Sequence, residues 1–105
     1  MDSFILVFST FSSEDEAKKI SNQVVKARLA ACANIVPKVH SIFHWKNELS
    51  HEDEVMVLMK TQKKHLKELV LWIQSHHSYE LPEVIALPII GGSEEYLDWI
   101  KEETS

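Results

Sequence analysis

The stretch Phe4-Ile5-Leu6-Val7-Phe8, read FILVF, places five apolar residues in a row near the start of the chain. A short, uninterrupted run of β-forming residues is typical of a strand that is buried on both faces. The run is too short for a membrane span or for the apolar core of a signal peptide. We therefore expect a central strand here, no membrane segment, and a cytoplasmic protein.

A helix is predicted directly after this strand. Ser13 and Glu16 have the spacing of a capping box, in which the serine side chain closes the first turn. Apolar residues then recur at helical spacing, which predicts a helix that continues to about Leu29. These residues are Ala17, Ile20, Val24, Ala27 and Ala31.

β character resumes after this helix and is interrupted by a proline. Residues 31–36 read as a strand that reaches Pro37, where a residue without an N–H predicts a bulge or an edge. Residues 39–45 continue the strand, residues 46–48 (Lys-Asn-Glu) predict the tip of a hairpin, and residues 54–60 predict its returning partner.

The second half of the chain repeats the order of the first. Leu66, Leu69, Val70 and Ile73 lie at helical spacing in a segment that ends at His76-His77. Residues 84–90 form a fourth apolar strand, interrupted by Pro88. After the Gly91-Gly92 turn, Ser93 can cap a short last helix, whose apolar stripe is Tyr96, Leu97 and Ile100.

The elements follow the order β-α-β-β-α-β with a terminal helix, the split βαβ arrangement of an α+β fold. We expect residues 1–105 to form a single domain, in which two helices cover one face of a four-stranded antiparallel sheet. The first, third and fourth strands are apolar on both sides, so the other sheet face would be left in water. Self-association would cover that face.

Composition excludes several classes of function. A formal charge of -5, with ten lysines and only Arg28 as arginine, disfavours a nucleic-acid partner. Cys32 is the lone cysteine, so no disulfide can form within the chain. The glycines, Gly91 and Gly92, form no phosphate-binding loop, and Cys32 is far in sequence from the histidines that could serve as its base. We therefore expect a protein that is not an enzyme.

Several segments, in order, resemble the CutA family, which is named for divalent-cation tolerance. They are residues 27–35 (ARLAACANI), 41–46 (SIFHWK), 58–61 (LMKT), 82–83 (PE), 87–89 (LPI) and 96–100 (YLDWI). The resemblance implies a ferredoxin-like, PII-like fold assembled as a homotrimer. It also implies a cytoplasmic role in the binding of divalent metal ions, copper in particular.

Residues 76–83, HHSYELPE, contain the candidate metal ligands. The resemblance assigns copper binding to the paired histidines, which are His76 and His77 here, and to a thiol at a position where this chain has Ser9. Copper or zinc would be the ion, because imidazole suits borderline cations, and no organic cofactor is indicated. A helix end decorated with polar side chains is the alternative. Cys32, in an apolar segment, is predicted to be a buried structural thiol.

Other residues are candidates for a cleft or a subunit interface. Trp45 lies near the hairpin tip, and Lys60, Tyr79 and Glu80 have side chains that could line a cleft between subunits or form an interface ion-pair set. The sequence thus predicts a trimeric metal-binding protein involved in cation tolerance. The alternative is a PII-like regulatory or scaffold trimer that binds a small molecule or a protein.

Overall fold

The apolar run at residues 4–8 lies in the strand between two others, as predicted. The computed structural model describes residues 3–105, and its sheet has the order β2-β3-β1-β4. β1 (Phe4–Phe11) pairs antiparallel with β3 (Glu48–Gln62) and with β4 (Ile85–Ile89). β2 (Cys32–Trp45) pairs antiparallel with the other edge of β3. The proline-containing strand β4 is therefore an edge strand, where a missing N–H is tolerated.

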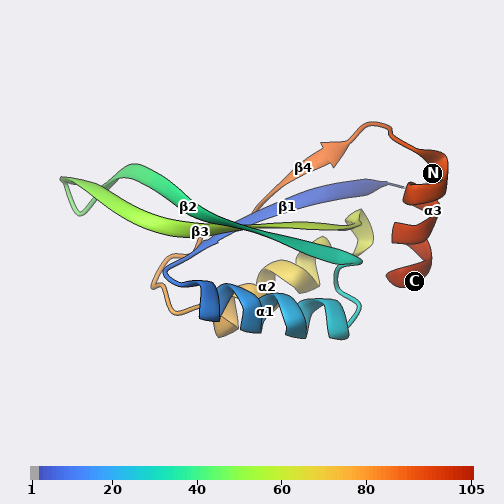
Figure 1. Ribbon diagram of the computed structural model, residues 1–105, viewed down its shortest axis with the longest axis horizontal. Helices are drawn as coiled ribbons and strands as arrows, with labels where there is room; N and C mark the ends of the chain where they lie inside the picture. The colour runs from blue at the N-terminus through green and yellow to red at the C-terminus, as the bar shows by residue number, and fades with distance from the viewer. Residues whose placement is uncertain (1–2) are drawn as a thin grey trace.

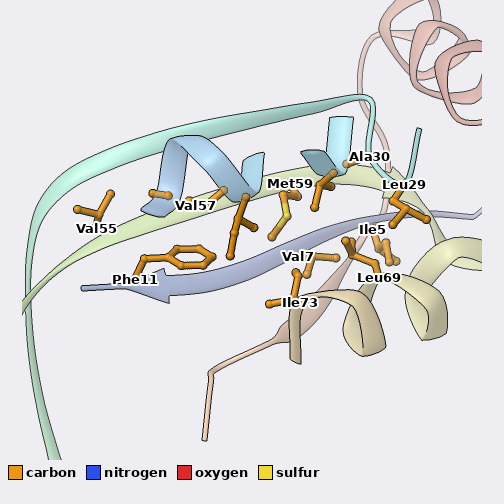
Figure 2. Packing of buried hydrophobic residues seen from close by; sticks show 13 residues of the cluster. Ile5, Val7, Phe11, Leu29, Ala30, Val55, Val57, Met59, Leu69 and Ile73 are labelled. Atoms are coloured by element: carbon orange, nitrogen blue, oxygen red, sulfur yellow. The ribbon is translucent and has the colours of Figure 1, made fainter. Parts of the chain in front are cut away.

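Both long helices lie on the same face of the sheet (Figure 1). They are α1 (Glu14–Lys26) and α2 (Leu66–His76), the latter entered through a short 3₁₀ turn at Lys63–His65. Their apolar stripes bury alternate residues of β1 and β3, among them Val7, Val57 and Met59, which are inaccessible to solvent (Figure 2). No helix among residues 3–105 is long and apolar enough to cross a membrane.

The third helix, α3 (Glu94–Glu103), lies near the end of the sheet at which β1 begins (Figure 1). Ser93 caps it as predicted, because its Oγ accepts the N–H of Tyr96 at 3.4 Å. Ile100 is buried, and Gln62 of β3 donates to the Thr104 hydroxyl at 3.0 Å. These contacts attach the C-terminal segment to β3.

α1 ends three residues earlier than the prediction of Leu29. Arg28 has a left-handed backbone with φ of 61°, and its N–H donates to Val25 O at 3.0 Å. The N–H of Leu29 donates to Val24 O at 3.1 Å, which completes a Schellman termination. Glycine is the usual residue at this left-handed position. Because the chain has arginine there, the sequence gives no signal that the helix ends.

β2 and β3 extend past the helices as a hairpin arm, defined here as residues 39–54 (Figure 1). The predicted bulge is confirmed: the register shifts between Val36 and Val39. The turn is shorter than the predicted Lys-Asn-Glu tip, since Trp45 pairs directly with Glu48. Lys46 and Asn47 have φ of 51° and 67°, as a two-residue type I′ turn requires.

The sheet face opposite α1 and α2 is apolar and partly exposed. Residues paired across neighbouring strands point to the same side, so Leu6 shares this face with Leu87, and Phe8 shares it with Leu58 and Ile85. Ile85 is 51% exposed and Leu87 is 49% exposed. We call these five residues, together with Phe4 and Met56, the open face.

Candidate functional site

The connection between α2 and β4, residues 77–84, is held against the start of α1. Ser78 donates from its N–H to Glu16 Oε2 at 2.9 Å and from its hydroxyl to Glu16 Oε1 at 3.0 Å. The N–H of Glu16 donates to Ser13 Oγ at 3.1 Å, the first half of the predicted capping box. The Glu16 carboxylate binds the connection, so one residue in the capped first turn of α1 also positions the candidate site.

His77 is a structural ring at the end of β1. Its Nε2–H donates to the carbonyl of Thr10 at 2.7 Å, and its Nδ1 accepts the N–H of Tyr79 at 3.0 Å. The ring stacks on buried Phe11, with centroids 4.5 Å apart and planes 13° apart. Both ring nitrogens thus have backbone partners, and an ion at either one would displace a hydrogen bond.

His76 points elsewhere and is exposed. Its ring stacks on Trp72 with centroids 3.9 Å apart, and its Nδ1 lies 2.7 Å from the Trp72 carbonyl. An Nδ1–H held by a carbonyl leaves Nε2 with a free lone pair, which is the usual arrangement behind a metal-binding histidine. The ring lines a hollow of about 380 Å³ between α1 and the end of α2, whose other lining residues are Asp15, Glu16, Lys19, Ile20 and Gln23. We call this the His76 hollow.

The two adjacent histidines are therefore not brought together on one point. His77 is the C-cap of α2 and has an extended backbone, with φ of -77° and ψ of 144°. The change of backbone direction sends its ring toward β1, whereas His76 remains on the helix. The assignment of His76 and His77 as metal ligands stays a prediction. Both ring nitrogens of His77 are hydrogen-bonded to the backbone, whereas Nε2 of His76 is available to an ion.

A second cavity, of about 430 Å³, lies between the arm and the α2–β4 connection. Its lining includes three of the predicted cleft residues: Trp45, Tyr79 and Glu80. The Tyr79 hydroxyl donates to Glu54 Oε2 at 2.7 Å. Burial raises the pKa of Tyr79 well above its usual value, and the hydrogen bond to Glu54 and nearby carboxylates add to the increase. The cavity is acidic, since Glu52 also lines it.

Lys60, the fourth predicted cleft residue, lies near α3 and not in this cavity. Its ammonium donates to Asn34 Oδ1 at 3.0 Å and to the Tyr96 hydroxyl at 3.4 Å. The Tyr96 hydroxyl also lies 3.6 Å from Cys32 Sγ. Cys32 is only partly buried in the single chain, which corrects the expectation of a buried thiol. It lies at the edge of the sheet, where β2 has no further neighbour among the described residues.

Sequence reasoning missed Glu54 and Glu16 as organising residues of the site. Glu54 is 7% exposed, an unusual burial for a carboxylate, and it sits where the apolar run of β3 meets the acidic stretch of residues 52–54. The position of Glu54 at this boundary is the feature of the sequence that could have indicated a buried carboxylate. Across residues 3–105, no three histidine, cysteine, aspartate or glutamate side chains are grouped so as to hold a metal ion.

Tyr79→Phe is expected to lower the free energy of unfolding by about 1.5–3 kcal/mol near neutral pH, because buried Glu54 loses a charge-assisted donor. The folded state holds the phenolic proton more tightly than the unfolded state, in which the pKa is about 10. The tyrosine's contribution is therefore complete below about pH 10 and is lost as pH rises further. Urea unfolding of parent and variant at pH 8 and above pH 10 should show the difference shrinking. A constant difference would contradict this assignment.

Comparisons with known proteins identify the family. Residues 5–103 match the family model described as CutA1 divalent ion tolerance protein. The chain is 40% identical over 100 residues to Arabidopsis thaliana "Protein CutA, chloroplastic", a match that covers 95% of this chain and 55% of that protein. It is 41% identical over 99 residues to the "Divalent-cation tolerance protein CutA" of Thermus thermophilus, covering 94% of this chain and 96% of the relative.

Solved structures agree with the sequence match. The divalent cation tolerance protein (Cut A1) from Thermus thermophilus superposes with a TM-score of 0.93 at 40% identity and covers 100% of both chains. A periplasmic divalent cation tolerance protein CutA from Archaeoglobus fulgidus gives a TM-score of 0.92 at 34% identity, again covering 100% of both chains. The family model, the relatives and the fold agree, and the chain belongs to the CutA1 family of divalent ion tolerance proteins.

Proposed function

We propose that the chain forms a homotrimeric, single-domain CutA protein that binds a divalent metal ion, copper or zinc, and contributes to divalent-cation tolerance. The description of the family and the name of the Thermus thermophilus relative suggest the physiological role, since both denote a tolerance protein and not an enzyme. A cytoplasmic location stays a prediction, because two relatives carry a chloroplast label and one solved structure carries a periplasmic label.

The open face carries the proposal of a trimer. An apolar sheet face without a covering layer is rare in soluble monomers, and self-association removes it from water. The arm supports the same proposal. Its apolar residues Ile42 and Leu49 are 60% and 62% exposed, because nothing else in residues 3–105 packs over them. A second or third copy could bury both surfaces.

The His76 hollow supports the proposal of metal binding. Its imidazole has Nδ1 at the Trp72 carbonyl, and the Asp15 carboxylate lines the same hollow. The Glu16 carboxylate is already used by Ser78, so Asp15 is the carboxylate that could add to the imidazole. One imidazole and one carboxylate make a weak site, and a tight one needs a further ligand from another subunit, such as Glu80.

Two measurements test the proposal. Equilibrium sedimentation is expected to show about three times the 12.1 kDa chain mass, and a stable folded monomer at micromolar concentration would contradict the trimer.

In calorimetric titration with Cu²⁺ and Zn²⁺, His76→Ala is expected to lower the affinity of the hollow's site about tenfold or more. His44→Ala is the matched control, since it removes another exposed histidine that does not line the hollow. If His76→Ala binds metal as the parent does, the PII-like regulatory alternative takes its place.

A further inference from the structure

Two histidines and an aspartate form a hydrogen-bonded chain on the arm, and none of the three lines either of the cavities described above. His40 Nδ1 lies 2.8 Å from Asp53 Oδ1, and His40 Nε2 lies 3.1 Å from His51 Nδ1. The imidazole centroids are 5.3 Å apart and the rings are inclined by 40°. His40 pairs with Asp53 across the two strands, and His51 pairs with Ile42, so the second contact is a diagonal one.

This chain of side chains faces solvent. Asp53 and His51 alternate in phase with Val55, so they belong to the face that α1 and α2 cover farther along the sheet. Both are residues of the arm, which extends beyond the ends of those helices (Figure 1). The side chain of His40 is 54% exposed and that of Asp53 is 89% exposed. Exposed ion pairs contribute about 0–1 kcal/mol, so stability of the hairpin gives little reason for this arrangement.

The hydrogen bonds set the chemistry of the two ring nitrogens. Asp53 accepts the Nδ1–H of His40, which leaves a lone pair on Nε2, as in the carboxylate–histidine pairs that support metal ligands. In the neutral pair, His51 Nδ1–H donates to that lone pair. When the His51 proton moves to its own Nε2, Nδ1 also presents a lone pair, with no net loss of a proton. Both nitrogens can then bind one ion in place of the shared hydrogen.

The distance between these nitrogens suits a shared ion. With bonds of about 2.0–2.1 Å, two imidazole nitrogens on one ion lie about 2.9 Å apart at a right angle and about 3.3 Å apart at a tetrahedral angle. The observed 3.1 Å falls between these two values. Both side chains are on the surface, so small rotations can direct the two lone pairs to one point.

We propose that His40 Nε2 and His51 Nδ1 bind a Cu²⁺ or Zn²⁺ ion on the arm, with Asp53 as a positioning residue for His40. Imidazole suits both ions. No third histidine, cysteine or carboxylate in residues 3–105 completes the ligand set, so water or an external ligand takes the other positions. The site takes its protein ligands from the arm alone and does not depend on the His76 hollow.

The test titrates the full chain with CuCl₂ in a His76→Ala background, so that binding at the hollow is already removed. We expect His51→Ala or His40→Ala to weaken the remaining Cu²⁺ binding about tenfold or more, and Asp53→Asn to weaken it about tenfold. Electron paramagnetic resonance should show two coupled nitrogens before the histidine changes and at most one after them. Circular dichroism confirms that each variant is folded.

His44→Ala is the matched control, because it removes another exposed imidazole from the same face of the arm without touching the hydrogen-bonded pair. Its affinity should stay within about twofold of the background protein, well inside the loss expected for a ligand. Unchanged Cu²⁺ binding in His51→Ala, or an equal loss in His44→Ala, would overturn the proposal. A failure at the hollow appears separately, as an unchanged affinity when His76→Ala is compared with the parent.

Discussion

Leu87→Glu together with Ile85→Glu is expected to convert the proposed trimer into monomers. Both side chains are about half exposed in the single chain, so the single chain can accept glutamates there. In an assembly that covers the open face, the same carboxylates would be buried without partners, which costs several kcal/mol for each ion. Sedimentation equilibrium should then give a mass near the 12.1 kDa of one chain.

Leu71→Glu is the control for this pair. Leu71 lies on α2 and is 57% exposed, so the change places one glutamate, half the charge added by the pair, at a similarly exposed leucine on the helical side of the molecule. It should leave the mass of the assembly unchanged. If Leu71→Glu dissociates the protein and the double change at Ile85 and Leu87 does not, the subunits meet through the helices and the open face is not the interface.

The order of elements could be predicted because the strands and helices carry strong periodic patterns. The run at residues 4–8 indicates a central strand, and β1 does lie between β3 and β4. The errors lie where the backbone takes left-handed conformations without glycine. Arg28 follows the end of α1, and Lys46 with Asn47 forms the hairpin turn. None of the three is glycine, the residue that usually marks a left-handed position in a sequence.

The candidate site was predictable in part. Trp45, Tyr79 and Glu80 were expected to line a cleft, and they line one cavity of the single chain. Lys60 was grouped with them, but it lies six residues along β3 from Glu54, the partner of Tyr79, which is about 20 Å of strand. Sequence separation does not reveal this, because the hairpin register decides which end of a long strand meets a given loop.

The histidine pair shows the same limit more sharply. Two histidines adjacent in the sequence suggest two ligands for one ion, but α2 ends between His76 and His77, so the two rings contact different neighbours. On the arm the reverse holds: His40 and His51 are separated by 11 positions and lie within hydrogen-bond distance. Knowledge of the cross-strand register would have been needed to find that pair.

His77→Ala is expected to lower the free energy of unfolding by about 2–4 kcal/mol, far more than the contribution of an exposed residue at a helix end. The ring donates to Thr10, accepts from Tyr79 and stacks on Phe11, which is inaccessible to solvent. Its removal leaves a backbone carbonyl and N–H without their partners and a void beside an aromatic ring. Urea unfolding at one fixed protein concentration measures the change, since the stability of an oligomer depends on concentration.

His76→Ala is the matched control, because it removes the same side chain one residue earlier, where the ring is exposed and rests on Trp72. It should cost about 1 kcal/mol or less. His77→Gln should fall between the two, since an amide can donate and accept but cannot stack as a ring does. The contrast separates the two histidines by role: His77 fastens the α2–β4 connection to the end of β1, while His76 stays available to an ion. Equal losses for His76→Ala and His77→Ala would mean that the contacts of His77 contribute no more than those of an ordinary helix end.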